Sequence, residues 1–351
     1  MIPMYCRRTL RKIIFVMNAL ICVAVQLGYA APVYAKDSHH PHYTGVNIAT
    51  GGFGGKVLPG VYGQTYVYPQ PKEYKSFLDV GMNTARIPFL WERVQPQPSG
   101  GLDAEEMKRL DQSIAGMSGY ALIILDVHNY ARYYGVSIGQ GNVTQEMLAD
   151  LWQKLAQHYK SNPRIAFGLM NEPSGITATE WRRAVDLSIV AIRKTGARNL
   201  ILVPGNRWSG VLAWYTGGPE SNAVALEGVR DPVNNFAIEM HIYYDFNSSG
   251  THWVCPDAVT AQKGILKATA WLRKNNYRGF VGEFGSSADP ICLNAMDNML
   301  QAMDENSGSW LGWTYWAAGA WWGKYPMSIQ PDTPGQIKPQ TAVLKRHLNK
   351  N

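Results

Sequence analysis

Short apolar runs alternate with longer amphipathic stretches along most of this chain. The runs are continuous rather than alternating, which is typical of parallel strands that are buried on both faces. Eight such runs are present, at residues 45–49, 84–89, 121–128, 165–171, 200–203, 236–243, 279–284 and 311–316. The pattern therefore predicts a largely parallel sheet.

Amphipathic stretches between these runs carry the signals of helix starts. Thr144 and Thr177 each precede one, with a glutamate in its first turn. The predicted helices span residues 71–80, 103–118, 144–159, 178–194, 259–274, 293–304 and 341–349. Strands that alternate with helices over this length predict an α/β fold, a (β/α)₈ TIM barrel, with a doubly wound open sheet as second choice. We expect one catalytic domain over residues 43–351.

The first 35 residues have the pattern of a secretory signal peptide. Residues 1–12 are basic, residues 13–29 are mostly apolar, and small residues precede a cleavage point before Lys36. An uncleaved membrane anchor is the alternative, because the apolar stretch approaches spanning length. We expect cleavage, a flexible segment at 36–42, and a secreted or periplasmic protein without a membrane partner.

Charge and glycine patterns exclude two classes of partner. The formal charge is +7, but four basic residues lie within the leader, and no Lys/Arg stripe with interleaved aromatics follows. We therefore expect no nucleic-acid partner. The glycines at 51–56 lack the spacing of a phosphate-binding loop, so we expect no nucleotide cofactor.

Cysteine usage predicts one disulfide. Cys6 and Cys22 leave with the leader, so Cys255 and Cys292 remain. An even number of cysteines in an oxidising compartment favours their pairing. No cluster of Cys and His has the spacing of a metal site, and we expect no metal.

Polar, titratable or aromatic residues end six of the predicted strands. In a (β/α)₈ barrel the carboxyl ends of the strands meet at one face, where function collects. The residues at or next to these ends are Arg86, Asp126, His128, Asn171, Glu172, His241, Tyr243, Glu283 and Trp316.

Two of these residues form a candidate catalytic pair. Glu172 and Glu283 stand at the carboxyl ends of strands four and seven, which lie on opposite sides of a barrel mouth. Glycosidic bond cleavage needs one protonated carboxyl group and one ionised carboxylate, and a separation of about 5–5.5 Å gives retention of configuration. The alternative for Glu172 alone is a helix cap or a structural ion pair.

The sequence resembles glycoside hydrolase family 5, and within it the secreted fungal endo-β-1,4-glucanases. The resemblance covers roughly residues 43–345 and implies a (β/α)₈ barrel, a retaining mechanism and no cofactor. It is carried by GVN (45–47), LPGVYGQTYVYP (58–69), RIPFLWERVQP (86–96), LDVHNYARYYG (125–135), GLMNEP (168–173), LVPGN (202–206), EMHIYYDFNSSGTHWVC (239–255), VGEFG (281–285) and GWTYWAAGAWWG (312–323).

The resemblance implies roles around the two glutamates. Glu172 matches the general acid/base and Glu283 the nucleophile. Arg86 and Tyr243 match residues that hydrogen-bond the nucleophile, and an adjacent cation is expected to lower its pKa. Cys255 and Cys292 match a disulfide pair, in agreement with the cysteine count.

Further roles concern the sugar. Asn171 matches the residue that bonds the sugar 2-hydroxyl, and His128 and His241 match the two active-site histidines, with His241 placed to orient the acid/base. Trp316 matches the aromatic platform at the cleavage point. Buried packing or an ion pair is the alternative for each of these side chains and for Arg86.

Other tryptophans are candidate platforms for more distant sugars, because flat C–H faces of sugars stack on aromatic rings. Trp321 and Trp322 follow the last strand, and Trp208 and Trp214 follow the fifth. The alternative for each is core packing. The glycine-rich segment 51–56 departs from the family pattern and leaves the preference among β-glucans open.

The expected function is hydrolysis of internal bonds in cellulose or a related β-glucan by a monomer. β-Mannanase, mixed-linkage glucanase, xyloglucanase and transglycosylating activities use the same two glutamates and stay open. A carbohydrate-binding envelope protein without catalysis is disfavoured, because Glu172 and Glu283 are both present. A membrane-tethered interaction protein would require an uncleaved leader.

Overall fold

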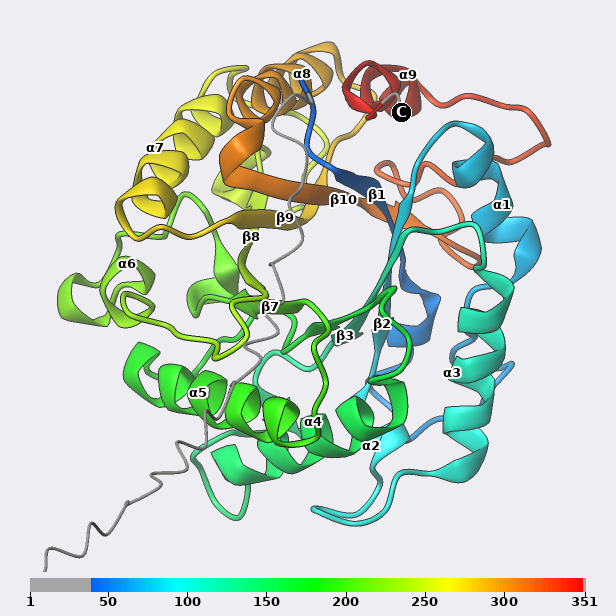
Figure 1. The fold of residues 1–351 in the computed structure, drawn as a ribbon. Helices are drawn as coiled ribbons and strands as arrows, with labels where there is room; N and C mark the ends of the chain where they lie inside the picture. The colour runs from blue at the N-terminus through cyan, green and yellow to red at the C-terminus, as the bar shows by residue number, and fades with distance from the viewer. Residues whose placement is uncertain (1–38, 350–351) are drawn as a thin grey trace, which may run out of the picture. The chain divides into compact units, whose positions relative to one another are not determined.

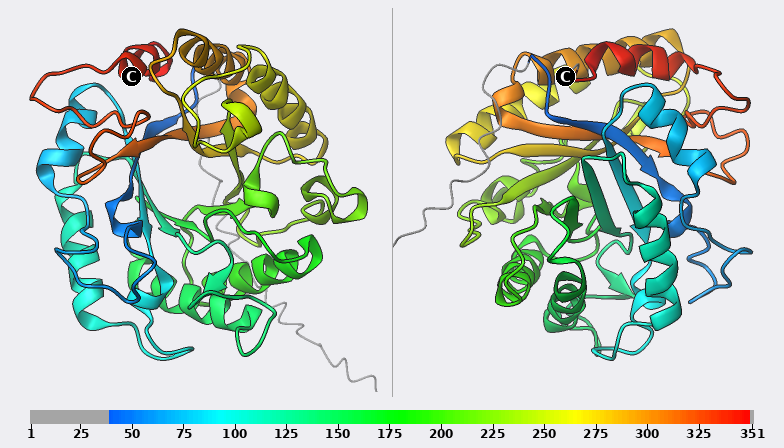
Figure 2. Two further views of the ribbon diagram at one scale, coloured as in Figure 1. Left: turned by 180° about the vertical axis from the view of Figure 1, so that it is seen from behind. Right: turned by 45° about the vertical axis from the view of Figure 1, so that its right-hand side comes forward.

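The computed structural model describes residues 39–349, in which eight parallel strands close into a barrel. Helices surround the ring of strands (Figure 1) and lie outside it in two further views (Figure 2). The predicted barrel is confirmed, and the doubly wound open sheet is excluded. In barrel order the strands are β1 (Tyr43–Ile48), β10 (Trp310–Ala318), β9 (Gly279–Gly285), β8 (Phe236–Tyr243), β7 (Ile201–Pro204), β6 (Ile165–Gly168), β3 (Leu122–Val127) and β2 (Thr84–Phe89).

All eight predicted strands are present, and the predicted long helices form the outer layer. These helices are α1 (Pro71–Asp79), α3 (Ala104–Gly116), α4 (Gln145–Tyr159), α5 (Ala178–Lys194), α7 (Thr260–Lys274), α8 (Pro290–Asp304) and α9 (Pro339–Leu344). Thr177 caps α5 as expected, because its side chain accepts from the backbone N–H of Glu180.

Some boundaries and short elements differ from the prediction. Helix α8 begins three residues early, because the Asp289 side chain accepts from two backbone N–H groups in its first turn. Helix α9 ends at Leu344 and continues as a 3₁₀ turn to His347. The predictions missed α2 (Trp91–Val94), α6 (Asn222–Ala225) and the small hairpin of β4 (Arg132–Tyr133) and β5 (Val136–Ser137).

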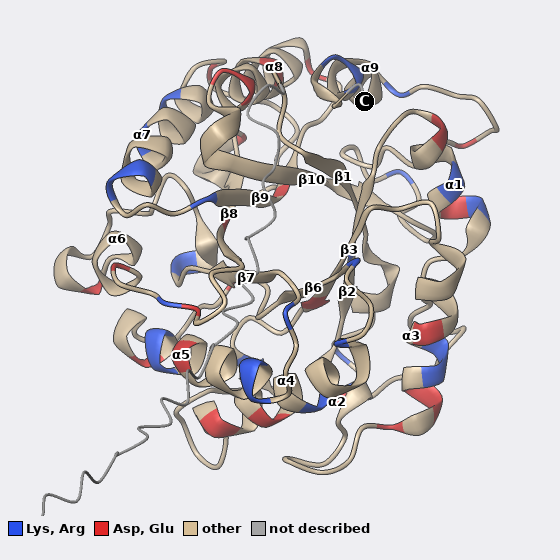
Figure 3. Ribbon diagram, in the orientation of Figure 1, with Lys and Arg blue, Asp and Glu red and all other residues tan. Residues whose placement is uncertain are grey.

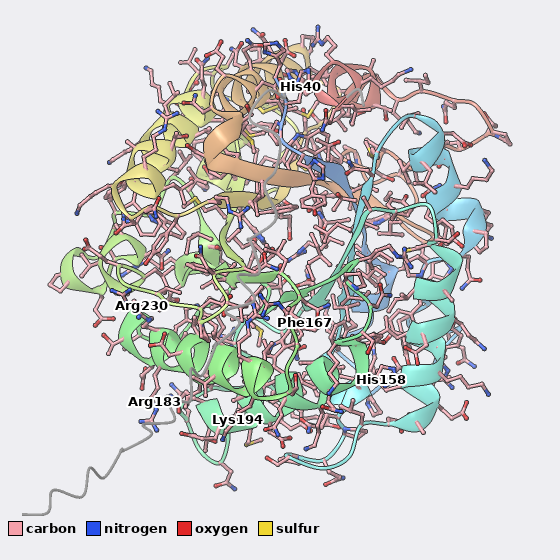
Figure 4. The ribbon with its side chains drawn as sticks, viewed as in Figure 1. His40, His158, Phe167, Arg183, Lys194 and Arg230 are labelled. Carbon is pink, nitrogen blue, oxygen red and sulfur yellow. A yellow bond between two sulfur atoms is a disulfide. The ribbon has the colours of Figure 1, made fainter. Side chains whose placement is uncertain are left out.

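The interior of the barrel is stratified along its axis. An apolar cluster fills the amino-terminal end, and includes Leu122 and Ile124 of β3, Ala237 of β8 and Phe280 of β9. Side chains alternate in direction along a strand, so the next inward positions on β3 and β8 are Asp126 and Glu239. The apolar layer therefore supports a charged layer at the carboxyl ends. A larger apolar cluster packs the outside of the strands against the helices, and side chains fill this space in Figure 4.

The predicted disulfide is present between Cys255 and Cys292, with their Cα atoms 5.1 Å apart. It joins the loop after β8 to the first turn of α8. Lys, Arg, Asp and Glu are interspersed along the outer helices (Figure 3). Within residues 39–349, no helix has the length and apolar character needed to cross a membrane. The predicted signal peptide at 1–35 and residues 36–38 of the predicted flexible segment lie outside the described residues.

Candidate active site

Arg86 lies at the centre of the charged layer and is fully buried. Its guanidinium forms ion pairs with three carboxylates from three other strands. The N–O distances are 3.0 Å to Asp126, 3.2 Å to Glu239 and 3.5 Å to Glu283. A buried charge is costly unless it is paired, so these carboxylates both stabilise Arg86 and are held in place by it.

Glu172 and Glu283 meet above this layer. One carboxylate oxygen of each, together with a nitrogen of His241, lies in a group whose atoms are all within 4.8 Å of one another. Glu172 follows β6 and has a left-handed φ of 44°, a conformation rare for non-glycine residues and concentrated at functional sites. Glu283 lies on β9 and is buried. The structure thus brings together the two glutamates that the sequence indicated.

His241 connects the two glutamates. Its Nδ1 lies 2.9 Å from Oε1 of Glu172 and 3.6 Å from Oε2 of Glu283. Burial lowers the pKa of the imidazole, but the negative charge of Glu283, the hydrogen bond to Glu172 and the nearby carboxylate of Glu239 outweigh it and raise the pKa to about 10. The raised pKa favours the imidazolium form of His241 at neutral pH.

The environment of Glu283 raises its pKa. Burial is the main cause, and the negative charge of Glu172 adds to it, whereas His241 and Arg86 act in the opposite direction. Arg86 lowers this pKa, as expected of an adjacent cation, but desolvation outweighs the cations and the net shift is upward. The Tyr243 hydroxyl donates to Oε1 of Glu283 at 2.6 Å and orients the carboxylate.

Asn171 offers a free donor to the site. Its Oδ1 accepts from Arg86 at 2.9 Å, which fixes the orientation of the side-chain amide. Its Nδ2 is buried and has no hydrogen-bond partner within residues 39–349. Buried donors are almost always paired, so this atom is available for a ligand oxygen.

His128 and Trp316 lie at the carboxyl ends of β3 and β10. Nδ1 of His128 is 2.7 Å from a carboxylate oxygen of Asp126, which orients the ring. The rings of His128 and Trp316 are nearly parallel, with an interplanar angle of 9° and centroids 5.4 Å apart. Both rings line one cavity, and their role in sugar binding stays a prediction.

Two cavities extend from this centre. One, of 450 Å³, is lined by His128, Tyr130 and Trp316 and by the glycine-rich segment around Phe53. The other, of 610 Å³, is lined by Glu172, His241 and Tyr243 together with Trp208. One cavity thus adjoins the stacked rings of His128 and Trp316, and the other adjoins Glu172.

The other tryptophans have different environments. Trp208 and Trp321 are exposed, by 58% and 49%, and available for stacking. Trp322 packs edge-on against Trp316, with ring centroids 5.6 Å apart, and supports that ring. The interpretation of Trp214 as a sugar platform is wrong, because its side chain is fully buried and packs against Trp271.

The sequence predictions missed two buried polar residues of the site, Asn47 and Glu239, and noted a third, Asp126, at a strand end without giving it a role. Asn47 accepts from Arg86 at 2.9 Å, and Asp126 and Glu239 form ion pairs with Arg86. The alternation of side chains along a strand could have identified Glu239 and Asp126. Glu239 lies two residues before His241, and Asp126 two before His128, so each shares a strand face with a histidine of the site.

The site also resembles a small metal-binding cluster in its distances, because Glu172, His241 and Glu283 present three donor atoms close together. The chemistry of the cluster does not fit a cation. Arg86 lies 3.5 Å from Glu283, and the imidazole is protonated at neutral pH, so positive charge already faces these carboxylates. We therefore derive no metal-dependent step.

Comparison with known proteins agrees with this geometry. The family described as "Cellulase (glycosyl hydrolase family 5)" matches residues 44–319. The chain belongs to glycosyl hydrolase family 5. It is accordingly a glycoside hydrolase, as the resemblance implied, and its barrel is that of the family.

Relatives in this family are similar over nearly the whole chain. Endo-β-1,4-glucanase B of Emericella nidulans is 31% identical over 336 residues, which cover 95% of this chain and 99% of the relative. The solved structure of XacCel5A in complex with cellopentaose is 45% identical, has a TM-score of 0.85, and covers 88% of this chain and 99% of that chain. The structure of Cel5A (EG2) of Hypocrea jecorina is 30% identical and has a TM-score of 0.78. It covers 89% of this chain and 99% of that chain.

Proposed function

We propose that the protein is a secreted, retaining endo-β-1,4-glucanase that hydrolyses internal bonds of cellulose or a related β-glucan. The single observation that carries the proposal is that one carboxylate oxygen of Glu172 and one of Glu283 lie within 4.8 Å of each other beside a cavity that Glu172 lines. This separation suits a double displacement, because inverting enzymes need a larger gap of about 6.5–9.5 Å for a water molecule. The names of the similar glucanases support the choice of substrate.

In the first step Glu283 attacks the anomeric carbon while Glu172 donates its proton to the leaving oxygen. The C–O bond to the leaving sugar breaks, and a covalent glycosyl-enzyme forms. In the second step Glu172 takes a proton from water, whose oxygen displaces Glu283. The product then has the configuration of the substrate.

The neighbouring residues assist these steps. Tyr243 and Arg86 hold the carboxylate of Glu283 in position for attack. His241 orients Glu172 through the 2.9 Å contact. The free Nδ2 of Asn171 is placed to bond the sugar 2-hydroxyl, a contact that strengthens in the transition state.

The aromatic residues along the cleft suit a polysaccharide chain. Trp316 serves as the platform beside the catalytic pair, and Trp208 extends the cleft past Glu172. Trp321, next to a further cavity of 510 Å³, is available to a more distant sugar. One cavity adjoins Trp316 and another adjoins Glu172, so the site has room for sugars beyond the bond that is cut, as internal cleavage of a long chain requires.

Secretion is the part of the proposal that rests on the leader and the disulfide. The signal-peptide pattern of the first 35 residues and the Cys255–Cys292 bridge both suit an exported protein. Mass determination of the exported chain tests cleavage before Lys36. Light scattering of the same sample tests whether the protein is a monomer.

A panel of soluble polysaccharides tests the activity. Carboxymethyl cellulose, barley glucan, mannan and xyloglucan are each incubated with the enzyme and the products are sized. We expect rapid shortening of the β-1,4-glucans and retained anomeric configuration by NMR. Preference for mannan or xyloglucan would refute the substrate, and products longer than the input would favour glycosyl transfer.

A further inference from the structure

Glu239 is a fully buried carboxylate beneath the catalytic pair, with no part in the steps described above. It lies on β8, two residues before His241 and on the same face of the strand. Its Oε1 is 3.2 Å from Nε of Arg86 and 3.6 Å from Nε2 of His241. One oxygen of this side chain thus faces the two cations that contact the catalytic glutamates.

His241 depends on Glu239 for its second acceptor. Nδ1 of the imidazole is engaged by Glu172, and within residues 39–349 no hydrogen bond satisfies Nε2. Glu239 is the carboxylate that faces Nε2. An imidazolium carries a donor on each nitrogen, so an acceptor on this side keeps Nδ1–H directed at Glu172.

Arg86 does not need Glu239 for neutralisation alone. Its guanidinium also pairs with Asp126 at 3.0 Å and Glu283 at 3.5 Å. Glu239 therefore supplies negative charge beyond what Arg86 requires, and the remaining partner for that charge is His241.

The nucleophile strand makes room for this carboxylate. A Cβ atom on Gly282 would lie 2.1 Å from Oε1 of Glu239, closer than any real contact. Gly282 immediately precedes Glu283, so the backbone that carries the nucleophile packs directly on the Glu239 side chain. Glycine at this position permits that close approach.

We propose that Glu239 is a positioning residue that holds Arg86 and His241 from below and through them sets the placement of Glu283 and Glu172. The inference rests on the proposed function, because it assigns a role in that reaction. The ionisable groups around His241 come from five strands or the turns after them: Arg86, Asp126, Glu172, Glu239, Tyr243 and Glu283.

Two variants of Glu239 separate its charge from its shape. Glu239→Gln keeps the shape and removes the charge, whereas Glu239→Asp keeps the charge and withdraws it by one methylene group. We expect Glu239→Gln to lower kcat on cellopentaose about tenfold or more, and Glu239→Asp to lower it less. A wild-type kcat for Glu239→Gln would overturn the proposal, with or without a loss in Glu239→Asp, because the side chain would then only fill space.

A matched control removes a buried charge elsewhere. Glu73 is 3% exposed and caps α1 by accepting from the backbone N–H of Gln70. Glu73→Gln keeps this capping, since glutamine also serves at that position. We expect its kcat to equal that of the wild type. An equal loss of kcat in Glu73→Gln would overturn the inference, because general perturbation would explain both variants.

A spectroscopic measurement reports on His241 directly. In protein labelled with ¹⁵N-histidine, the ring of His241 is identified by its absence from His241→Gln. We expect the wild-type ring to stay doubly protonated between about pH 5 and 8. In Glu239→Gln we expect the ring of His241 to lose one proton at a lower pH than in the wild type. A purely structural role would leave this titration unchanged and would refute the proposal.

Two further outcomes are informative. If Glu239→Gln does not fold, kcat and the His241 titration are both measured on Glu239→Asp. A wild-type kcat together with an unshifted titration of His241 in that variant then overturns the proposal. If the wild-type protein cleaves no β-1,4-glucan, the proposed function fails, whereas the histidine titration still decides whether Glu239 acts on His241.

Discussion

Glu283 lies at the point where the most charges converge. Arg86, His241 and Tyr243 contact its two oxygens, and Glu172 faces it across the cleft. Burial and Glu172 raise its pKa while the cations oppose the shift. A carboxylate in this position is restrained and weakly solvated, and it faces Glu172, which lines the adjoining cavity; this suits the proposed nucleophile.

Removal of the nucleophile is the most direct test at this scale. We expect Glu283→Ala to lower hydrolysis of cellopentaose by about a thousandfold or more, because no covalent intermediate can form. Oligosaccharide binding, measured by calorimetry, should persist because the aromatic platforms are unchanged. Substantial residual turnover would place the nucleophile elsewhere.

The acid/base has a distinct chemical signature. We expect Glu172→Ala to be nearly inactive on cellopentaose but to recover turnover of an aryl β-cellobioside when azide is added. A good leaving group needs no proton, and azide replaces the water that Glu172 would have activated. The measurement is identification of the β-glycosyl azide. Recovery without such a product would contradict the assignment.

The Tyr243 hydroxyl predicts a shift in pH dependence. A donor to a carboxylate stabilises the ionised form, so its loss in Tyr243→Phe raises the pKa of Glu283 further. Because the nucleophile must be ionised, the acidic limb of kcat/KM should move to higher pH. The two glutamates titrate as a coupled pair, so the profile reports the pair. An acidic limb that stays in place or moves to lower pH would show that this hydrogen bond does not lower the pKa of Glu283.

At the scale of elements, Arg93 of α2 holds the glycine-rich wall of the cleft. Its guanidinium, buried, donates to the carbonyls of Gly51 and Pro59 at 2.6 and 2.7 Å, and to that of Phe53. One side chain therefore binds two carbonyls of the segment that departs from the family pattern, and a third carbonyl just beyond it. Phe53 and Trp316 line the same cavity, so this wall faces the sugar platform.

A conservative change at Arg93 tests this arrangement. Lysine keeps the charge but cannot donate to three separate carbonyls. We expect Arg93→Lys to raise KM for cellopentaose by about three- to tenfold, with a smaller change in kcat, because binding rather than chemistry is affected. Arg183→Lys on the outer side of α5, where Arg183 is exposed, is the matched control (Figure 4). Equal KM values in the two variants would argue against the role of Arg93.

At the scale of the described molecule, stability and catalysis occupy different layers. Apolar side chains fill the amino-terminal end of the barrel, and the charged groups stand above them at the carboxyl ends. The apolar burial that stabilises the fold also offsets the cost of the paired charges. Loops outside these layers are anchored separately, and the Cys255–Cys292 bridge ties one of them to α8.

The disulfide gives a prediction for the whole fold. It joins residues separated by 37 positions, and in the chain-entropy model such a loop contributes about 3–4 kcal/mol. We expect the double variant Cys255→Ser, Cys292→Ser to lose about this much free energy of unfolding in denaturant titrations. A reducing agent should lower the stability of the wild type and leave that of the double variant unchanged. Equal unfolding midpoints would contradict the prediction.

The strands, and the positions of Glu172 and Glu283 at one end of the barrel, were predictable from local patterns. Continuous apolar runs mark strands buried on both faces, and Glu172 follows one such run while Glu283 lies near the end of another. Short elements were missed, because four residues such as those of α2 carry too little periodicity. Trp214 and Trp208 lie close together in sequence, yet one is buried and the other exposed. Sequence position alone does not separate such neighbours.

The amino-acid order by itself determined which residues could reach the mouth of the barrel, because strand period and chain direction place them there. Only the tertiary structure decided how they act on one another. Asp126, Glu239 and Glu283 come from three strands, and closure of the sheet brings them around Arg86. The raised pKa values of His241 and Glu283 arise from that shared burial and charge, which depend on distances between strands far apart in the chain.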